Sequence, residues 1–144
     1  MSAAGLREDM ILRIRQAVLD ELFVHAREEA PNECCGLLIG TEGFIHRAAR
    51  ARNLRQGPTR YLIDPVDHFA AVRTARTDGL SVVGAYHSHP ASGPGPSKTD
   101  LAEAASPTFA YVIVSPGTRD TADAVQAFYL APENVIPLEL VPVA

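Results

Sequence analysis

The feature that most constrains this chain is the alternation of short apolar runs with two stretches of helical periodicity. Residues 16–29 repeat apolar side chains at helical spacing, and residues 64–77 begin with the Asp-Pro pair typical of a helix start. A further short helix is expected at 98–104. The runs predicted as strands are 12–14, 34–39, 44–51, 61–63, 80–87, 109–115, 124–130 and 135–141. Strands mixed with helices, several of them joined by hairpins, predict an α/β fold: a single-domain mixed sheet flanked by helices.

Length and composition favour a compact domain. A chain of 144 residues suits one domain over 1–144, with 1–9 expected to be a flexible N-terminus, and buries roughly 68 to 70 per cent of its unfolded surface. The chain is 47% hydrophobic and 21% charged, which argues against disorder. Its net charge of −4, without a basic stripe, argues against nucleic acid as a partner. No apolar run approaches the ~20 residues of a membrane span, so we expect a soluble protein without a membrane partner.

The two cysteines, Cys34 and Cys35, are adjacent. Neighbouring thiols rarely pair with each other, so they cannot staple a secreted scaffold, and a reducing cytoplasm fits best. As zinc ligands they lack the Cys-x-x-Cys spacing, and on a strand they would point to opposite faces. Small buried hydrophobic residues are the better interpretation, although a nucleophilic role is the alternative.

His87 and His89 alternate with one residue between them, and Asp100 follows eleven residues after the second. If the apolar run before them is a strand that reaches them, both imidazoles project from the same face. Two histidines and one carboxylate form a ligand set that leaves a fourth tetrahedral position on zinc for water. The alternative is that the histidine pair is polar surface near a turn.

Ser97 and Asp100 have a purely structural interpretation as well. Residues 90–96 are too rich in proline and glycine to continue a strand or a helix. Ser97 would then be a helix N-cap and Asp100 its partner in a capping box with Asp in place of Glu. Capping accounts for both residues without a metal, but it also holds Asp100 rigidly, so capping and chemistry can coexist.

Glu33 on its own is most simply a solvated turn residue, because it follows Pro-Asn and Glu is rarely buried. The remaining histidines stand singly in amphipathic stretches and are expected to be surface or satisfied structural residues; they are His25, His46 and His68.

Taken together, these segments resemble the signature of the JAMM metalloproteases, the zinc-bearing branch of the MPN domain superfamily. The resemblance rests on His-Ser-His-Pro at 87–90, on the spacing to Ser97 and Asp100, and on Pro-Asn-Glu-Cys-Cys-Gly at 31–36. It covers nearly the whole chain, with no departure at the functional positions. It implies an architecture similar to cytidine deaminases.

The resemblance also implies roles for five residues. His87, His89 and Asp100 would bind one Zn²⁺ per chain, with a catalytic water as fourth ligand. Glu33 would be the general base acting on that water, and Ser97 would stabilise the tetrahedral intermediate.

The chain looks like the short stand-alone prokaryotic members of this family. Residues 53–61 and 106–109 are too brief for the insertions by which eukaryotic members of this family bind a second ubiquitin. The resemblance therefore implies a zinc metallopeptidase or isopeptidase that hydrolyses the bond after the C-terminal Gly-Gly of a ubiquitin-like or sulfur-carrier protein. An inactive MPN-type scaffold is the alternative. A zinc deaminase is excluded, because the chain lacks both His-x-Glu and Pro-Cys-x-x-Cys.

Overall fold

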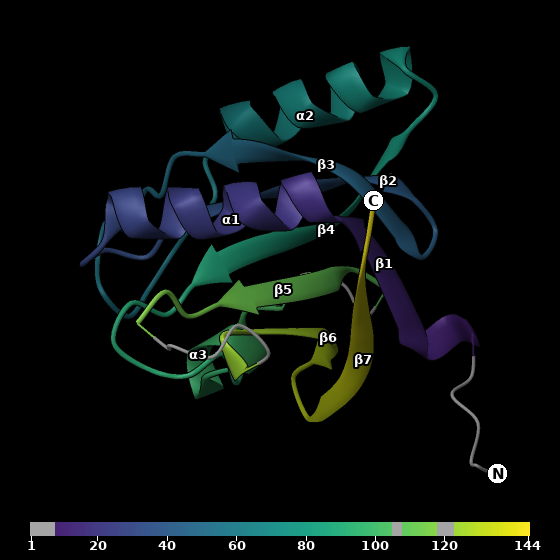
Figure 1. The fold of residues 1–144 in the computed structure, drawn as a ribbon. Coiled ribbons are helices and arrows are strands. Elements are labelled where there is room, and N and C mark those ends of the chain that lie inside the picture. The colour runs from purple at the N-terminus through teal and green to yellow at the C-terminus, as the bar shows by residue number, and fades with distance from the viewer. Residues whose placement is uncertain (1–7, 105–107, 118–122) are drawn as a thin grey trace, which may run out of the picture.

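A computed structural model describes residues 8–104, 108–117 and 123–144 (Figure 1). Of the N-terminal residues expected to be flexible, 1–7 lie outside the described residues, and Glu8–Met10 form one 3-10 turn. The helices are α1 (Gln16–Glu29), α2 (Pro65–Thr77) and α3 (Lys98–Ala102). The strands are β1 (Ile11–Arg15), β2 (Cys35–Thr41), β3 (Phe44–Ala51), β4 (Ser81–Ser88), β5 (Ala110–Val114), β6 (Val125–Ala131) and β7 (Asn134–Val143).

The strands form one mixed sheet in the order β1-β3-β2-β4-β5-β6-β7. β1 runs parallel to β3 and β7, and β4 runs parallel to β5, whereas the other neighbours are antiparallel. The predicted α/β fold with a mixed sheet and flanking helices is therefore confirmed. The sheet also closes into a barrel, because β1 pairs with β7 as well as with β3.

Each face of the sheet packs against one long helix (Figure 1). On β5, Val112 and Val114 belong to the core that includes the apolar stripe of α1, whereas Tyr111 and Ile113 belong to the core that includes Ala71 of α2. This period of two is the alternation that a strand imposes on its side chains. Residues of one strand that differ by two in number therefore share a face and a helix.

Two expected elements differ from the structure. The interpretation of 61–63 as a strand is wrong: Ile63 makes only an isolated bridge to Asn53. The backbone hydrogen bonds of this segment go to the chain just after β3, through Leu54 N–H to the Leu62 carbonyl (2.8 Å) and Asp64 N–H to the Arg52 carbonyl (3.0 Å), so it folds back locally instead of joining the sheet. The short third helix ends at Ala102, two residues before the expected end at 104. Part of the expected short segment 106–109 lies outside the described residues.

Among the described residues, no helix is both long enough and apolar enough to cross a membrane.

Candidate metal centre

The two alternating histidines lie at the end of β4, as the apolar run before them predicts. Ala85 packs in the core on the α2 side of the sheet, so His87 and His89 project from that same side. The backbone N–H of His89 donates to the Val114 carbonyl at 2.9 Å, which extends the pairing of β4 with β5 up to the second histidine. His87 is 0% exposed and His89 6%. The alternative that the pair is polar surface is thus wrong.

The structure brings Asp100 of α3 to these two imidazoles. His87 Nε2 and His89 Nε2 are 3.2 Å apart, and each lies 3.1 Å from Asp100 Oδ2. Ligands bound to zinc at about 2.0 Å in tetrahedral geometry are separated from one another by roughly 3.3 Å. The three atoms therefore form a triangle of the size that one face of a zinc tetrahedron requires, and the residues present fit that ion.

Neighbouring groups fix the orientation of His89. Its Nδ1 lies 2.9 Å from the Gly93 carbonyl in the loop after β4. A carbonyl only accepts, so Nδ1 carries a proton, and Nε2 is the nitrogen that faces the other two ligand atoms and is left to bind a metal. The Pro/Gly-rich loop thus supplies an outer contact of the metal centre.

Ser97 and Asp100 form the expected capping box at the start of α3. Ser97 N–H donates to Asp100 Oδ2 at 2.9 Å, and Asp100 N–H donates to Ser97 Oγ at 3.0 Å. The same carboxylate oxygen that caps the helix faces the two histidines. Capping and metal binding are thus compatible, and the Ser97 hydroxyl, which accepts here, keeps its own hydrogen to donate.

The electrostatics of the cluster suit a cation. Burial acts to raise the pKa of Asp100, but hydrogen bonds from His87 and His89 outweigh it and hold that pKa well below its ordinary range. Burial lowers the pKa of His87, in opposition to Asp100. For His89, burial also acts to lower the pKa, but the hydrogen bonds with Asp100 and the Gly93 carbonyl outweigh it and raise that pKa above the ordinary value. The carboxylate is therefore charged at neutral pH, and His87 is neutral, the form that binds metal.

Glu33 lies beside this centre because of the register between β2 and β4. Cys35 is paired with His87, and Ser88 N–H donates to the Cys34 carbonyl at 3.1 Å. Cys34 thus lies opposite Ser88, and the next step of the same antiparallel register places Glu33 opposite His89. Glu33 is 3% exposed, so it is not a solvated turn residue.

The Glu33 carboxyl has the properties of a general base. Burial raises its pKa to about 7, with His89 acting to lower it and the charge of Asp100 adding to the rise. Its Oε1 has no hydrogen-bond partner among the described residues. A carboxyl with a pKa near neutrality and a free acceptor oxygen is suited to take a proton from water at physiological pH.

Both cysteines are buried free thiols, as expected. Burial is the main cause that raises the pKa of Cys34 to about 11 and that of Cys35 to about 12. Neither belongs to the ligand cluster. They therefore stay protonated, which leaves them poorly suited as nucleophiles.

The single histidines have three different environments. His25 is buried and its Nδ1 lies 2.8 Å from the Tyr86 hydroxyl, which makes it a satisfied structural residue. His46 stacks on Phe44 at the sheet. His68 of α2 lines a cavity that reaches the metal centre.

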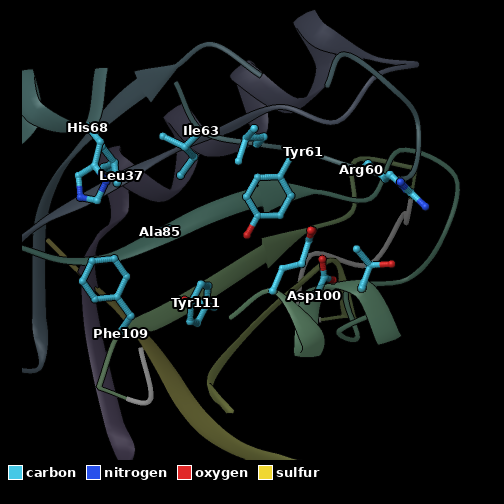
Figure 2. A pocket seen from close by; sticks show the side chains of 12 residues that line it. Leu37, Arg60, Tyr61, Ile63, His68, Ala85, Asp100, Phe109 and Tyr111 are labelled. Atoms are coloured by element: carbon cyan, nitrogen blue, oxygen red, sulfur yellow. The ribbon is translucent and has the colours of Figure 1, made fainter. Parts of the chain in front are cut away.

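This cavity has a volume of about 340 Å³ and a mainly apolar lining (Figure 2). Tyr61 and Asp100 lie toward one end of it, and His68 and Phe109 toward the other. Tyr61 also stacks on His87, with ring centroids 4.3 Å apart and planes inclined by 19°. Sequence reasoning missed this contact, because Tyr61 was assigned to a strand; an aromatic residue in a polar segment just before the Asp64-Pro65 helix start is the only signal that pointed to it.

Comparison with known proteins shows the family to which this chain belongs. Residues 15–129 match the family described as prokaryotic homologues of the JAB domain. A desampylase of Haloferax volcanii is 37% identical over 110 residues, which cover 72% of this chain and 79% of the relative. A CysO-cysteine peptidase of Mycobacterium tuberculosis is 36% identical over 112 residues, covering 76% and 75%. The solution structure of protein DSY2949 from Desulfitobacterium hafniense superposes with a TM-score of 0.83 at 30% identity, covering 92% of this chain and 93% of that one.

The mixed sheet between two helices, with a histidine pair, an aspartate and a buried glutamate at one end of β4, defines a hydrolase of the JAMM type. The chain belongs to the prokaryotic JAB-domain family of the JAMM/MPN superfamily.

Proposed function

We propose that this protein is a zinc-dependent metallopeptidase or isopeptidase that hydrolyses the bond after the C-terminal Gly-Gly of a ubiquitin-like or sulfur-carrier protein. The observation that carries the proposal is the triangle of His87 Nε2, His89 Nε2 and Asp100 Oδ2, with edges of 3.1 to 3.2 Å, next to the buried carboxyl of Glu33. His87, His89 and Asp100 would hold one zinc ion, and water would complete its coordination.

A zinc ion in this position would supply a Lewis acid that polarises the scissile carbonyl and lowers the pKa of water toward ~7. Glu33 takes the proton from the attacking water, because its Oε1 is unpaired and its pKa of about 7 matches neutral conditions. The same carboxyl then delivers the proton to the leaving amine. Glu33 holds no position in the ligand triangle and acts only as a proton carrier.

Ser97 stabilises the negative charge that develops on the carbonyl oxygen. Its Oγ is fixed by the hydrogen bond from Asp100 N–H, so the hydroxyl hydrogen is the one free to donate. The capping box thereby sets a donor close to the metal ligand Asp100 without further rearrangement.

The burial of the centre supports a substrate that ends in glycines. All three ligand residues are at most 8% exposed, and a chain without side chains can approach such a centre most closely. The apolar cavity that ends at Asp100 offers room for the residues next to the glycines. The relatives named desampylase and CysO-cysteine peptidase support a tail of this class.

We also propose a single domain over 1–144 and a reducing compartment such as the cytoplasm. The family match over 15–129 supports the first. The two buried thiols, which are free, support the second.

The decisive experiment compares the wild type with Glu33→Gln on a panel of ubiquitin-like and sulfur-carrier fusions, read by mass spectrometry. The wild type is expected to cut after Gly-Gly with one zinc per chain. Glu33→Gln is expected to keep the zinc and to lose turnover by a factor of about 10² to 10⁴, the usual contribution of a general base.

Glu42→Gln is the matched control, because Glu42 is an exposed carboxylate in the hairpin between β2 and β3. It should cut at the wild-type rate. Purified protein without zinc would favour the scaffold alternative, and full activity of Glu33→Gln would show that the assigned roles are wrong.

A further inference from the structure

The two histidines of the metal centre are held in different ways. Metal-binding histidines commonly donate their second ring N–H to a carbonyl or carboxylate, which fixes the ring. His89 has such a partner in the Gly93 carbonyl. The Nδ1 of His87 is buried and has no hydrogen-bond partner among the described residues. Some other contact must therefore keep Nε2 of His87 directed at Asp100.

That contact is the ring of Tyr61. The two rings are nearly parallel, with centroids 4.3 Å apart and an angle of 19° between their planes. A ring so close to its face stops the imidazole from turning about its Cβ–Cγ bond. Tyr61 lies at the same end of the cavity as Asp100 (Figure 2). Stacking thus replaces the hydrogen bond that His87 lacks.

Besides the backbone hydrogen bonds to the chain after β3, one side chain, that of Asn53, fastens the segment that carries Tyr61. Asn53 Nδ2 donates to the carbonyls of Glu33 and Arg60, at 3.1 Å each. Asn53 Oδ1 accepts from the N–H groups of Arg55 (3.0 Å) and Leu62 (2.9 Å). Its amide therefore binds the residues on both sides of Tyr61 and, in addition, the backbone of the general base.

We propose that Tyr61 is a positioning residue whose ring holds the imidazole of His87 in its metal-binding orientation, and that Asn53 ties the Tyr61 segment to the backbone of Glu33. This inference rests on the proposed zinc site. It predicts that the stacked ring, not the phenol hydroxyl, sets the zinc affinity.

The first test measures zinc affinity by competition with a chromogenic chelator for wild type, Tyr61→Phe and Tyr61→Leu. Tyr61→Phe keeps the ring and should bind zinc within about twofold of the wild type. Tyr61→Leu should bind about 10- to 100-fold more weakly, the loss typical when a residue that orients a metal ligand is substituted. The absorption spectrum of the cobalt-loaded protein should change with Leu and stay unchanged with Phe.

Phe109→Leu is the matched control, because Phe109 lines the same cavity but contacts Tyr111 and not the histidines. It should keep zinc affinity and the cobalt spectrum. Tyr61→Met, whose longer, unbranched side chain adapts better to irregular space, replaces Tyr61→Leu if that variant does not fold.

The second test asks whether Asn53 acts through Tyr61. Asn53→Asp retains both acceptor contacts but places a carboxylate oxygen against the Glu33 and Arg60 carbonyls. Alone, it should weaken zinc binding at least fivefold. In the Tyr61→Leu background it should add less than twofold, because residues that act through one contact are not additive.

The outcomes separate this inference from the proposed function. If the wild type binds no zinc, the proposed function fails. If the wild type binds zinc and Tyr61→Leu binds it equally well, or Tyr61→Phe is as weak as Tyr61→Leu, the positioning role of Tyr61 is overturned. Full additivity of Asn53→Asp and Tyr61→Leu would overturn the role of Asn53.

Discussion

At the scale of single residues, the burial of Glu33 favours the role proposed for it but lowers the stability of the fold. Its carboxyl needs a pKa near neutrality to accept a proton from water, and burial raises that pKa to about 7. The ionised form in this position is costly, because Oε1 has no partner among the described residues to compensate for lost water. Stability is therefore lower wherever the carboxyl is ionised.

Glu33→Gln should stabilise the zinc-free protein at pH 8 by about 1 to 2 kcal/mol. The pKa of Glu33 in the folded state is about 7, above that of an unfolded glutamate at about 4.3. Between these values the folded state binds more protons, so the wild type loses stability as pH rises from about 4.5 to 7. Gln is neutral throughout and avoids this loss. Urea unfolding at pH 8 and pH 5 measures the difference in unfolding free energy between Glu33→Gln and the wild type.

The gain from Glu33→Gln should shrink at pH 5, where the wild-type carboxyl is protonated in the fold. Glu42→Gln, on the exposed hairpin, should change stability by less than about 0.5 kcal/mol at both pH values. An equal gain for Glu33→Gln at both pH values would mean that its ionisation is not the cause.

Cys34 and Cys35 permit a second prediction at this scale. Both thiols are buried, and burial raises their pKa values to about 11 and 12, so almost no thiolate is present at pH 8. Native protein should therefore show no alkylation by iodoacetamide within an hour by intact-mass spectrometry, and full alkylation in denaturant. Rapid native alkylation that abolishes hydrolysis would point to a thiol mechanism.

At the scale of elements, β4 carries His87 and leads directly into His89, and Gly84 sets how closely this strand approaches β5. Gly84 is paired with Ala110, and a Cβ on Gly84 would lie 2.0 Å from the Ala110 carbonyl oxygen. Such a contact cannot be accommodated without a shift of one strand. The position therefore requires glycine for close approach.

Gly84→Ala should destabilise the protein by about 2 to 3 kcal/mol, the upper part of the range for overpacking. Since the displaced strand leads into His87, zinc affinity should also fall. Gly95→Ala is the control, because nothing lies within 4 Å of a Cβ there. Thermal unfolding and chelator competition measure both effects, and a neutral Gly84→Ala would contradict the tight pairing.

The sequence predicted elements well where a period extended over several residues. The stripe of α1 and the alternation on β4 are signals of this kind. The prediction from sequence was wrong at 61–63, because three residues are too few to show a hydrophobic periodicity. There the backbone hydrogen bonds to the chain after β3 decide the conformation, and such pairing is not encoded in local composition.

At the scale of the whole molecule, the first strand meets the last, because β1 pairs with β7. The mixed sheet was predictable, but its closure was not, because pairing between distant strands leaves no local signal. The candidate site divides in the same way. His87, His89 and Asp100 were found by spacing, whereas the contacts of Asn53 and Tyr61 arise only when the loop after β3 folds over them.

The proposed metal ligands come from β4, the chain just after it and α3, so zinc should couple these parts and stabilise the whole fold. A ligand that binds only the folded state at 100 times its Kd contributes about 2.7 kcal/mol, on the order of 10 °C in Tm for a domain of this size. We therefore expect zinc to raise Tm by that amount at pH 7.5 and a chelator to reverse the rise.

This rise in Tm should disappear as pH falls, because protons compete with zinc for the imidazole nitrogens. The pKa of His89 is raised, so it takes up its proton first; burial lowers the pKa of His87, so release is completed below the ordinary histidine value of about 6.5. Scanning fluorimetry from pH 8 to pH 4, with chelated protein at each pH as control, measures the difference. A zinc-dependent Tm rise that persists unchanged at pH 4 would exclude both histidines as ligands, since a protonated imidazole has no lone pair for the metal.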